Sequence, residues 1–371
     1  MTLRQRILSV YRGEQPDVVP FMLDLSHWFY QRHQLPWDVS SVYITPEKEL
    51  LNYHKRHQIG FYLANNAAFY SASHADSVEA LVTKSPDGRE VSWTYRTPLG
   101  EITRRRRWEE VSYSWGISKW GVTSERDLKV LGYALGNRSF TPCWQRYEDW
   151  VEYLGDSGVV YIGAGYSAIG QLLHYWMGVE QTLFASFDWN RTLHEVVDRI
   201  NQSCLECIDL LAASPAEIII MGDNFSSDVQ PPAFFAEWSR PYYLEATRRL
   251  HRAGKQVAVH IDGRLRGSLA MIRDCGADCA DAVTPAPSGD LTADQCRREA
   301  GPAFILSGGI SPSLWLPETP REEFVRAVKA WIGLKKYGPR LIAATGDQVP
   351  PGAEEERIWL MRDLVEKHGL Y

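Results

Sequence analysis

The chemistry-bearing residues with the most telling spacing are His260 and Asp262, which end the apolar run QVAVHIDG two positions apart. Alternate residues of a strand point to the same side, so both side chains are expected to face one side of a strand end. Asp347 ends the last apolar run, LIAATGDQ, and could converge with them. An imidazole with two carboxylates suits a divalent metal, zinc in particular, with one coordination position left open. The same groups could instead act as acid and base, or only hydrogen-bond neighbouring loops.

Other polar residues that follow apolar runs are candidates for the same site. Asp24 ends the run VVPFMLD, and Asp223 follows EIIIM closely. An unpaired carboxylate there would be costly unless it met a ligand or a hydrogen-bond network. We therefore take Asp24 and Asp223, together with His260, as candidate catalytic residues, although Asp223 could equally cap the following loop. Side chains near these strand ends are expected to contact the substrate, namely His27, Trp28, Tyr166 and Asn224.

Five apolar runs of the chain stop at a polar residue, and this pattern indicates how the candidate residues are positioned. Segments of helical period separate the runs, so strand and helix alternate as in parallel α/β folds. We predict a closed (β/α)8 TIM barrel, in which the active site lies where the strands end. The ends of five strands should therefore meet on one rim, at Asp223, His260, Thr284, Ser307 and Asp347.

Residues 77–120 interrupt this order with alternating strand patterns and the turn sequences PDG and PLG. We predict a hairpin-rich antiparallel insertion, beside or over the barrel mouth, within a single domain of residues 1–371. Tryptophans of the N-terminal part could wall a pocket for a flat ligand, or only pack the insertion onto the barrel; they include Trp28, Trp93, Trp115 and Trp120. Helices are expected at about 2–12, 124–135, 146–154, 168–177, 179–187, 192–213 and 232–253.

Composition excludes several classes of function. The net charge is −6, so the run Arg104–Arg107 is expected to be a solvated strand face or an anion contact, and nucleic acid is not an expected partner. Six cysteines and the start MTLRQRILSV, which carries no apolar leader, favour a reduced, cytoplasmic protein. No apolar stretch has the length of a membrane span, so no membrane is expected as a partner.

The order and the amino-acid sequences of these segments resemble those of the uroporphyrinogen decarboxylase superfamily, which also contains cobalamin-linked methyltransferases. The start RQRILSVYRGEQPDVVPFMLD resembles that of the superfamily, and the stretch from GDNFSSDVQPPAFFAEWSRPYYLEATRRLHRAGKQVAVHIDGRL to LSGGI resembles its C-terminal half. The ending ATGDQVPPGAEEERI is similar to the segment in which the methyltransferases carry their last zinc ligand. The resemblance implies a (β/α)8 barrel and a homodimer.

The functional residues of the superfamily transfer only in part. The decarboxylases hold substrate carboxylates on an arginine-rich N-terminal loop, whereas the matching stretch LDLSHWFYQRHQ keeps only Arg32, and TGDQ replaces their C-terminal histidine motif. The thiol-activating methyltransferases bind zinc through His-x-Cys and a late Cys. Here His260 keeps the first position, while Asp262 and Asp347 occupy the two cysteine positions. Carboxylates make a harder metal centre, which could still polarise an oxygen.

The expected function is therefore a methyltransferase of the corrinoid-linked type. A metal on His260, Asp262 and Asp347 would activate a small methyl donor or acceptor, and the corrinoid would be carried by a partner protein. One alternative is a cofactor-free decarboxylase of a tetrapyrrole or a smaller acid, in which Asp24 or Asp223 stabilises the protonated intermediate. Another is a non-catalytic member that binds a corrinoid or tetrapyrrole.

Overall fold

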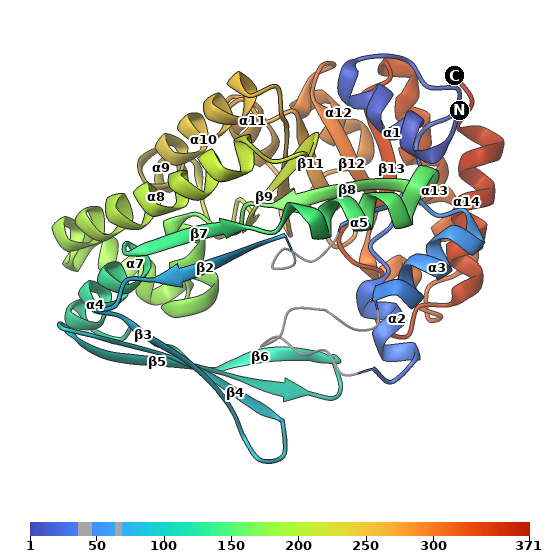
Figure 1. The fold of residues 1–371 in the computed structure, drawn as a ribbon. Helices are drawn as coiled ribbons and strands as arrows, with labels where there is room; N and C mark the ends of the chain where they lie inside the picture. The colour runs from blue at the N-terminus through green and yellow to red at the C-terminus, as the bar shows by residue number, and fades with distance from the viewer. Residues whose placement is uncertain (36–46, 64–68) are drawn as a thin grey trace.

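A computed structural model describes residues 1–35, 47–63 and 69–371. Its centre is a curled, parallel, seven-stranded sheet of an α/β fold, with the strand order β1-β8-β9-β10-β11-β12-β13 (Figure 1). The strands are β1 (Phe61–Leu63), β8 (Gly158–Gly163), β9 (Ile218–Phe225), β10 (Gln256–Ile261), β11 (Cys279–Val283), β12 (Ile305–Ile310) and β13 (Leu341–Thr345).

The segment of residues 20–23 hydrogen-bonds to both edge strands of this sheet. On the β13 side, Met22 N donates to Ala343 O at 3.1 Å and Ala343 N donates to Pro20 O at 2.8 Å. On the β1 side, Leu23 N donates to Gly60 O and Gly60 N donates to Phe21 O, both at 3.1 Å. Both pairings are parallel. The run VVPFMLD thus brings Asp24 next to the carboxyl ends of β1 and β13.

Strands β9 to β13 are consecutive neighbours and all pair in parallel, which confirms the prediction that these five strands share one rim. Their runs are apolar because both faces of the sheet are covered. Side chains on one face join α1 (Leu3–Arg12) in a small cluster that includes Ile7, Ile218 and Ile342. The other face packs against the helices in the main core. Since α1 fills the interior next to the strand starts, the open end is the one with the polar residues.

Helices connect the strands and form the outer layer, and their bounds agree with most of the expected ranges. In the part of the chain that is described, no helix has the length and apolar character needed to cross a membrane. The remaining helices are α2 (Ser26–Arg32), α3 (Glu47–His57), α4 (Glu125–Leu135), α5 (Trp144–Leu154), α6 (Ala168–Gln171), α7 (Val179–Asp188), α8 (Asn190–Ala212), α9 (Pro232–Trp238), α10 (Arg240–Arg252), α11 (Ser268–Arg273), α12 (Ala293–Ala300), α13 (Arg321–Ile332) and α14 (Glu355–His368).

Two predicted elements differ from the structure. The helix expected at 232–253 is two helices, α9 and α10, with Ser239 between them. Pro241 explains the break, because its ring lacks an N–H and clashes with the carbonyl four residues earlier in a continuous helix. Strand β12 does not end at Ser307 but continues to Ile310, so Ser307 lies fully buried inside the strand.

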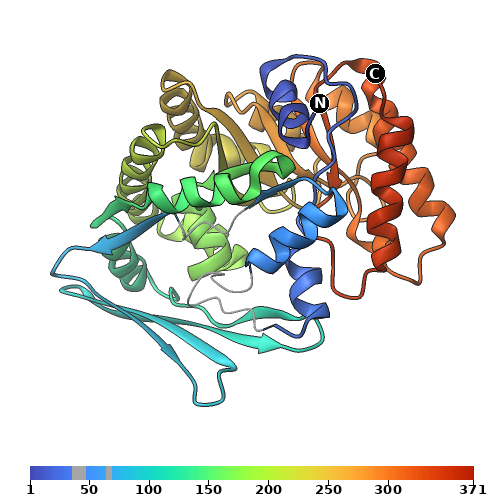
Figure 2. The same cartoon turned by 45° about the vertical axis from the view of Figure 1, so that its right-hand side comes forward.

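Residues 79–119 form a separate, four-stranded antiparallel sheet of β3 (Glu79–Lys84), β4 (Glu90–Thr97), β5 (Gly100–Glu109) and β6 (Ser114–Lys119). Figures 1 and 2 show it as a layer on one side of the parallel sheet, with α4 alongside; the two-stranded antiparallel sheet of β2 (Tyr70–His74) and β7 (Arg138–Pro142) lies between. Because strand residues alternate between faces, β5 presents Arg105 and Arg107 to solvent, while Arg104 and Arg106 face the aromatic side chains of Tyr175 and Trp176.

Candidate active site

A cavity of about 260 Å³ lies at the carboxyl ends of the parallel strands. Five of the residues predicted for the site line it, and each comes from a different part of the chain. The predicted residues in the wall are Asp24, Tyr166, Asn224, His260 and Asp347. Other lining residues are Tyr62, Gly165, Ile220, Met221, Gly222 and Gln348. The rim of parallel strand ends therefore collects polar groups that are distant in the sequence.

His260 lies near the end of β10 and is held in one orientation by a buried carboxylate. Its Nδ1 is 3.1 Å from Oδ2 of Asp281, whose side chain is 1% exposed, and the carboxylate accepts the Nδ1 proton. The other ring nitrogen, Nε2, lies 3.9 Å from Oδ1 of Asp347 on the cavity side. Asp281 sits on the neighbouring strand β11, directly opposite His260 in the ladder. Strand pairing thus sets the orientation of the imidazole.

The charges around the cavity favour a protonated His260. Burial alone would lower the pKa of His260, but the hydrogen bond to Asp281 and the charges of Asp281, Asp347 and Asp262 raise it to about 9. Burial raises the pKa of Asp347 to about 6, and the charges of Asp262 and Asp24 act in the same direction while His260 opposes them. Between these two values the cavity holds an imidazolium next to a carboxylate, which is an acid and a base side by side.

Asp24 is fixed by three hydrogen bonds. Its Oδ1 accepts from the backbone N of Ser26 at 2.9 Å and from Ser26 Oγ at 2.6 Å, and its Oδ2 accepts from Gln348 Nε2 at 3.1 Å. These bonds tie the start of α2 to the loop after β13. Asp24 is therefore a rigid negative charge in the wall of the cavity.

Asp223 does not line the cavity. Its side chain is fully buried and accepts hydrogen bonds from Ser167 N at 2.7 Å and Ser167 Oγ at 2.5 Å, at the start of α6. Burial raises its pKa. Asp223 and Asn224 adopt φ values of +94° and +43°, so the backbone is strained where the chain turns Asn224 toward the cavity. There Asn224 Oδ1 accepts a hydrogen bond from Tyr166 OH at 2.8 Å.

Replacing Asp223 with alanine is expected to lower the free energy of unfolding by about 1–3 kcal/mol, because the backbone N–H of Ser167 would remain buried without its acceptor. Urea denaturation followed by circular dichroism measures the change. The control is Asp228→Ala, since Asp228 lies in the loop directly after β9 but its side chain is 60% exposed. Equal stability of Asp223→Ala and wild type would contradict a positioning role for Asp223.

His27, Trp28 and the other tryptophans named above are not among the residues that line this cavity. Trp28 is 1% exposed, and its indole N–H donates to Ala353 O at 3.0 Å in the core. His27 Nε2 lies 2.9 Å from the carbonyl oxygen of Tyr113, so it links α2 to the antiparallel sheet. Trp93 stacks on Arg104, and Trp115 packs against Trp108. The structure gives these side chains packing and linking roles.

The predicted metal ligands meet only in part. Ligand atoms must lie within about 2.0–2.2 Å of a zinc ion, and a protein site supplies three or four of them. His260 Nε2 and Asp347 Oδ1 face each other, but Asp262 acts on His260 only through its charge in the contacts described. Within residues 1–35, 47–63 and 69–371, no three His, Cys, Asp or Glu side chains are grouped closely enough to hold a metal. The described donor set therefore does not fit a zinc ion as arranged.

Sequence reasoning missed three residues of the site, Asp281, Tyr62 and Gln348. Asp281 was detectable, because a carboxylate within the apolar run CADAVTPAP needs a buried partner. Tyr62 follows from no motif, since β1 is only three residues long. Gln348 directly follows Asp347, which was interpreted as a metal ligand, and an amide side chain beside it gave no separate signal.

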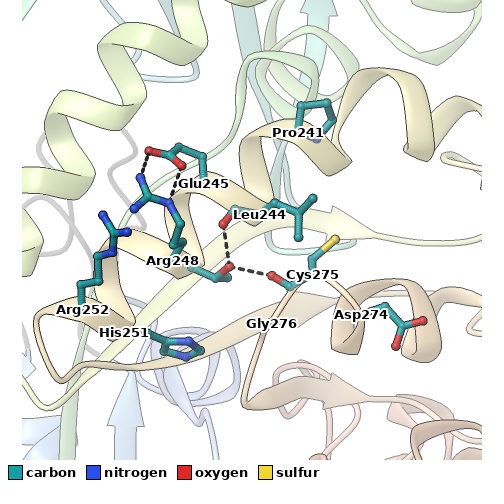
Figure 3. Close-up of a pocket in the computed structure, with 10 residues that line it drawn as sticks. Pro241, Leu244, Glu245, Arg248, His251, Arg252, Asp274, Cys275 and Gly276 are labelled. Carbon is teal, nitrogen blue, oxygen red and sulfur yellow. Dashed lines mark hydrogen bonds and ion pairs between the residues drawn. The ribbon is translucent and has the colours of Figure 1, made fainter.

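A larger depression of about 750 Å³ lies on the outer surface, beside α10 and the end of α11, far from the strand ends (Figure 3). Some of its polar groups pair with one another: Glu245 pairs with Arg248, and Thr247 Oγ1 donates to Cys275 O at 2.6 Å. Figure 3 shows that these charged side chains do not converge on one point, since Arg252 and Asp274 lie at opposite sides of the view. The depression therefore lacks the convergent chemistry of the cavity at the strand ends.

Residues 153–368, more than half of the chain, match the family model described as uroporphyrinogen decarboxylase (URO-D). No curated protein sequence matches the chain. Among solved structures, a methyltransferase from Methanosarcina mazei matches with a TM-score of 0.63 at 14% identity, covering 99% of this chain and 99% of that one. D-psicose 3-epimerase from Clostridium cellulolyticum H10 matches at a TM-score of 0.37 and 11% identity, covering 62% of this chain and 85% of that one. The first likeness shows a common fold, and the second is too distant to carry an argument.

Proposed function

The chain belongs to the uroporphyrinogen decarboxylase family. We propose that it is a methyltransferase in which His260 protonates the oxygen or nitrogen atom from which the methyl group of a small donor is removed. The observation that carries this proposal is the orientation of His260. Asp281 holds its Nδ1 and the second nitrogen, Nε2, is presented to the cavity 3.9 Å from Asp347.

Methyl transfer from oxygen or nitrogen needs an acid, because an alkoxide or amide ion is a poor leaving group. In the proposed reaction the bond between the methyl carbon and the heteroatom breaks, and its electron pair stays on the heteroatom. His260 Nε2 supplies the proton to the heteroatom as this bond breaks, so the demethylated product leaves as a neutral alcohol or amine. The acceptor nucleophile would be a corrinoid carried by a partner protein. Asp347, as a carboxylate, balances the charge of the imidazolium before transfer, and His260 regains its proton from solvent afterwards.

The fold is compatible with this proposal. The solved structure that covers 99% of both chains is named a methyltransferase. We also propose that residues 20–23 serve as the eighth strand, because they hydrogen-bond to both edges of the sheet and would close it into a (β/α)8 barrel. Closure would place Asp24 beside Asp347 in the wall of the cavity.

A decarboxylase is the second candidate, and the description of the matching family favours it. Loss of CO₂ leaves a carbanion that also needs a proton, and His260 could donate it from the same atom. The two reactions therefore use one acid but give different products.

A direct assay separates the two candidates. The purified protein would be mixed with reduced free cobalamin and a panel of simple O-methyl, N-methyl and S-methyl compounds, and mass spectrometry would measure the demethylated product. In parallel, CO₂ release would be measured with carboxylated pyrroles and tetrapyrroles in the absence of cobalamin. We expect demethylation that depends on cobalamin. CO₂ release without any demethylation would overturn the methyltransferase proposal in favour of the decarboxylase.

A further inference from the structure

A second cavity, of about 300 Å³, adjoins the first and has the opposite charge. Gly165 and Tyr166 belong to the walls of both cavities. The first contains two aspartates, whereas no acidic residue of the described chain lines the second, where the charged lining residues are Arg104 and Arg138. We call this second space the arginine cavity. Aromatic rings form much of its wall, from Tyr70, Tyr95, Phe140, Tyr166, Tyr175 and Trp176.

Arg104 is partly buried in this wall, and no carboxylate among the described residues pairs with it. Its guanidinium lies 4.2 Å from the ring centre of Trp93 and 5.0 Å from that of Trp176. Its Nε and Nη1 are buried, and neither has a hydrogen-bond partner among the described residues. Stacking on aromatic faces orients a guanidinium but leaves its in-plane N–H groups unsatisfied. A buried N–H of a charged group that lacks an acceptor destabilises the folded protein. The unpartnered N–H groups of Arg104 therefore indicate that a ligand supplies the acceptor.

Two further arginines add to the positive charge. Arg106 stacks on Tyr175, with 4.9 Å between its guanidinium carbon and the ring centre. Burial, together with the nearby charge of Arg106, lowers the pKa of Arg104 to about 10. The Nε of Arg106 is also buried and unpartnered within the described chain. Arg138 donates to Leu135 O at 2.8 Å and to the neutral side chains of Ser203 and Cys204, and no carboxylate of the described residues pairs with it. Like charges held together in this way favour an anion between them.

We propose that the arginine cavity binds the carboxylate of a small planar acid, with the ring of the acid lying between the aromatic walls. The paired in-plane N–H groups of an arginine match the two oxygens of a carboxylate. Because the two cavities share Gly165 and Tyr166, a ligand anchored in this way can extend its far end toward His260. This inference rests on the proposed function only where it makes that ligand the methyl donor. Binding itself is independent of turnover.

Benzoate is the probe for this site, and its neutral analogue benzamide is the control ligand. Isothermal titration calorimetry should show saturable benzoate binding to the wild-type protein and at least about tenfold weaker binding of benzamide. Arg104→Met should weaken benzoate by at least about tenfold as well. The matched control is Arg105→Gln, since Arg105 is the next residue of β5 but is exposed on the outer face, 3.6 Å from Glu90.

Thermal unfolding distinguishes a binding role of Arg104 from a purely structural one. If Arg104 awaits a ligand, Arg104→Met keeps or raises the Tm of the unliganded protein, and benzoate raises the Tm of wild type but not of the variant. A large fall in Tm for Arg104→Met, with benzoate affinity unchanged, would show that the stacking is structural. Benzamide binding as tightly as benzoate, phosphate displacing benzoate at equal affinity, or no saturable binding would each overturn the proposal.

The test of benzoate binding can fail or succeed independently of the test of methyl transfer. His260→Gln should keep the affinity of wild type for benzoate, because the ligand's carboxylate lies on the far side of Tyr166. Benzoate binding without any methyl transfer would support the arginine cavity and reject the reaction. Methyl transfer that saturating benzoate does not inhibit would support the reaction and reject the arginine cavity as the anchor of the methyl donor.

Discussion

Replacing His260 with glutamine is expected to lower kcat/KM by roughly 10²- to 10⁴-fold, the usual contribution of a positioned general acid. Glutamine can occupy similar space and accept or donate a hydrogen bond, but it cannot deliver a proton from the Nε2 position. Steady-state kinetics with the donor identified in the demethylation assay measure the change. We expect the fold to be kept, because His260 borders a cavity rather than filling the apolar core.

The chain supplies a matched control for this variant. His251 also pairs with an aspartate, with Nε2 2.9 Å from Oδ2 of Asp278, but it lies on the outer surface at the end of α10. Its pKa is raised by the hydrogen bond to Asp278. His251→Gln therefore removes a His–Asp pair without touching the cavity and should leave kcat/KM unchanged. Equal activity of His260→Gln and His251→Gln would rule out His260 as the proton donor.

Replacing Asp281 with asparagine is expected to move the alkaline limit of activity to lower pH. In the wild type the reaction needs protonated His260 and ionised Asp347, so kcat/KM should follow a bell-shaped curve that falls below about pH 6 and above about pH 9. Asparagine keeps the hydrogen-bond acceptor but removes the charge, and burial then lowers the pKa of His260. At pH 8.5 the variant should lose activity by roughly tenfold or more, whereas near pH 6 it should approach wild type.

The same substitution changes how stability depends on pH. The pKa of His260 is raised from 6.5 to about 9 in the folded protein, so the folded state holds this proton more tightly than the unfolded chain. The resulting stabilisation is complete below pH 6.5 and is lost as the pH rises through about 9. In urea unfolding, the free energy of unfolding of Asp281→Asn should therefore decrease less than that of wild type as the pH rises from 6.5 through about 9. Identical pH profiles of activity and stability in both proteins would contradict the coupling of Asp281 to His260.

Several features were accessible from the sequence because they depend on local pattern. Apolar runs with polar ends predict buried parallel strands, and β9 to β13 are neighbours with their polar residues toward one rim. Helical periodicity predicts α1 and α4, and the structure adds that the side chains of Thr2 and Ser124 cap them. Alternation within residues 77–120 likewise favours strands, and four antiparallel strands occur there. In each case neighbouring residues of the chain carry the information.

Pairing between distant segments could not be obtained in this way. The two-residue spacing of His260 and Asp262 predicted that these two side chains act together. In the structure His260 instead hydrogen-bonds to Asp281 on β11, because parallel pairing places Asp281 opposite it. Asp223 looked equally suited to catalysis and to capping, and only the position of Ser167 directs its carboxylate away from the cavity. Register between strands depends on the whole sheet, so no motif in a single segment specifies it.

The sequence by itself determined the order of strands and helices, the family resemblance and the rim that carries His260 and Asp347, because periodicity and strand ends are local properties. The tertiary structure alone decided which polar groups meet. It packed β5 against the aromatic residues after β8, so that Arg104 lines the arginine cavity, apart from the cavity that holds His260, while Arg105 stays exposed. Charge in a protein acts through distance and burial, and both are set by contacts between segments that lie far apart in the chain.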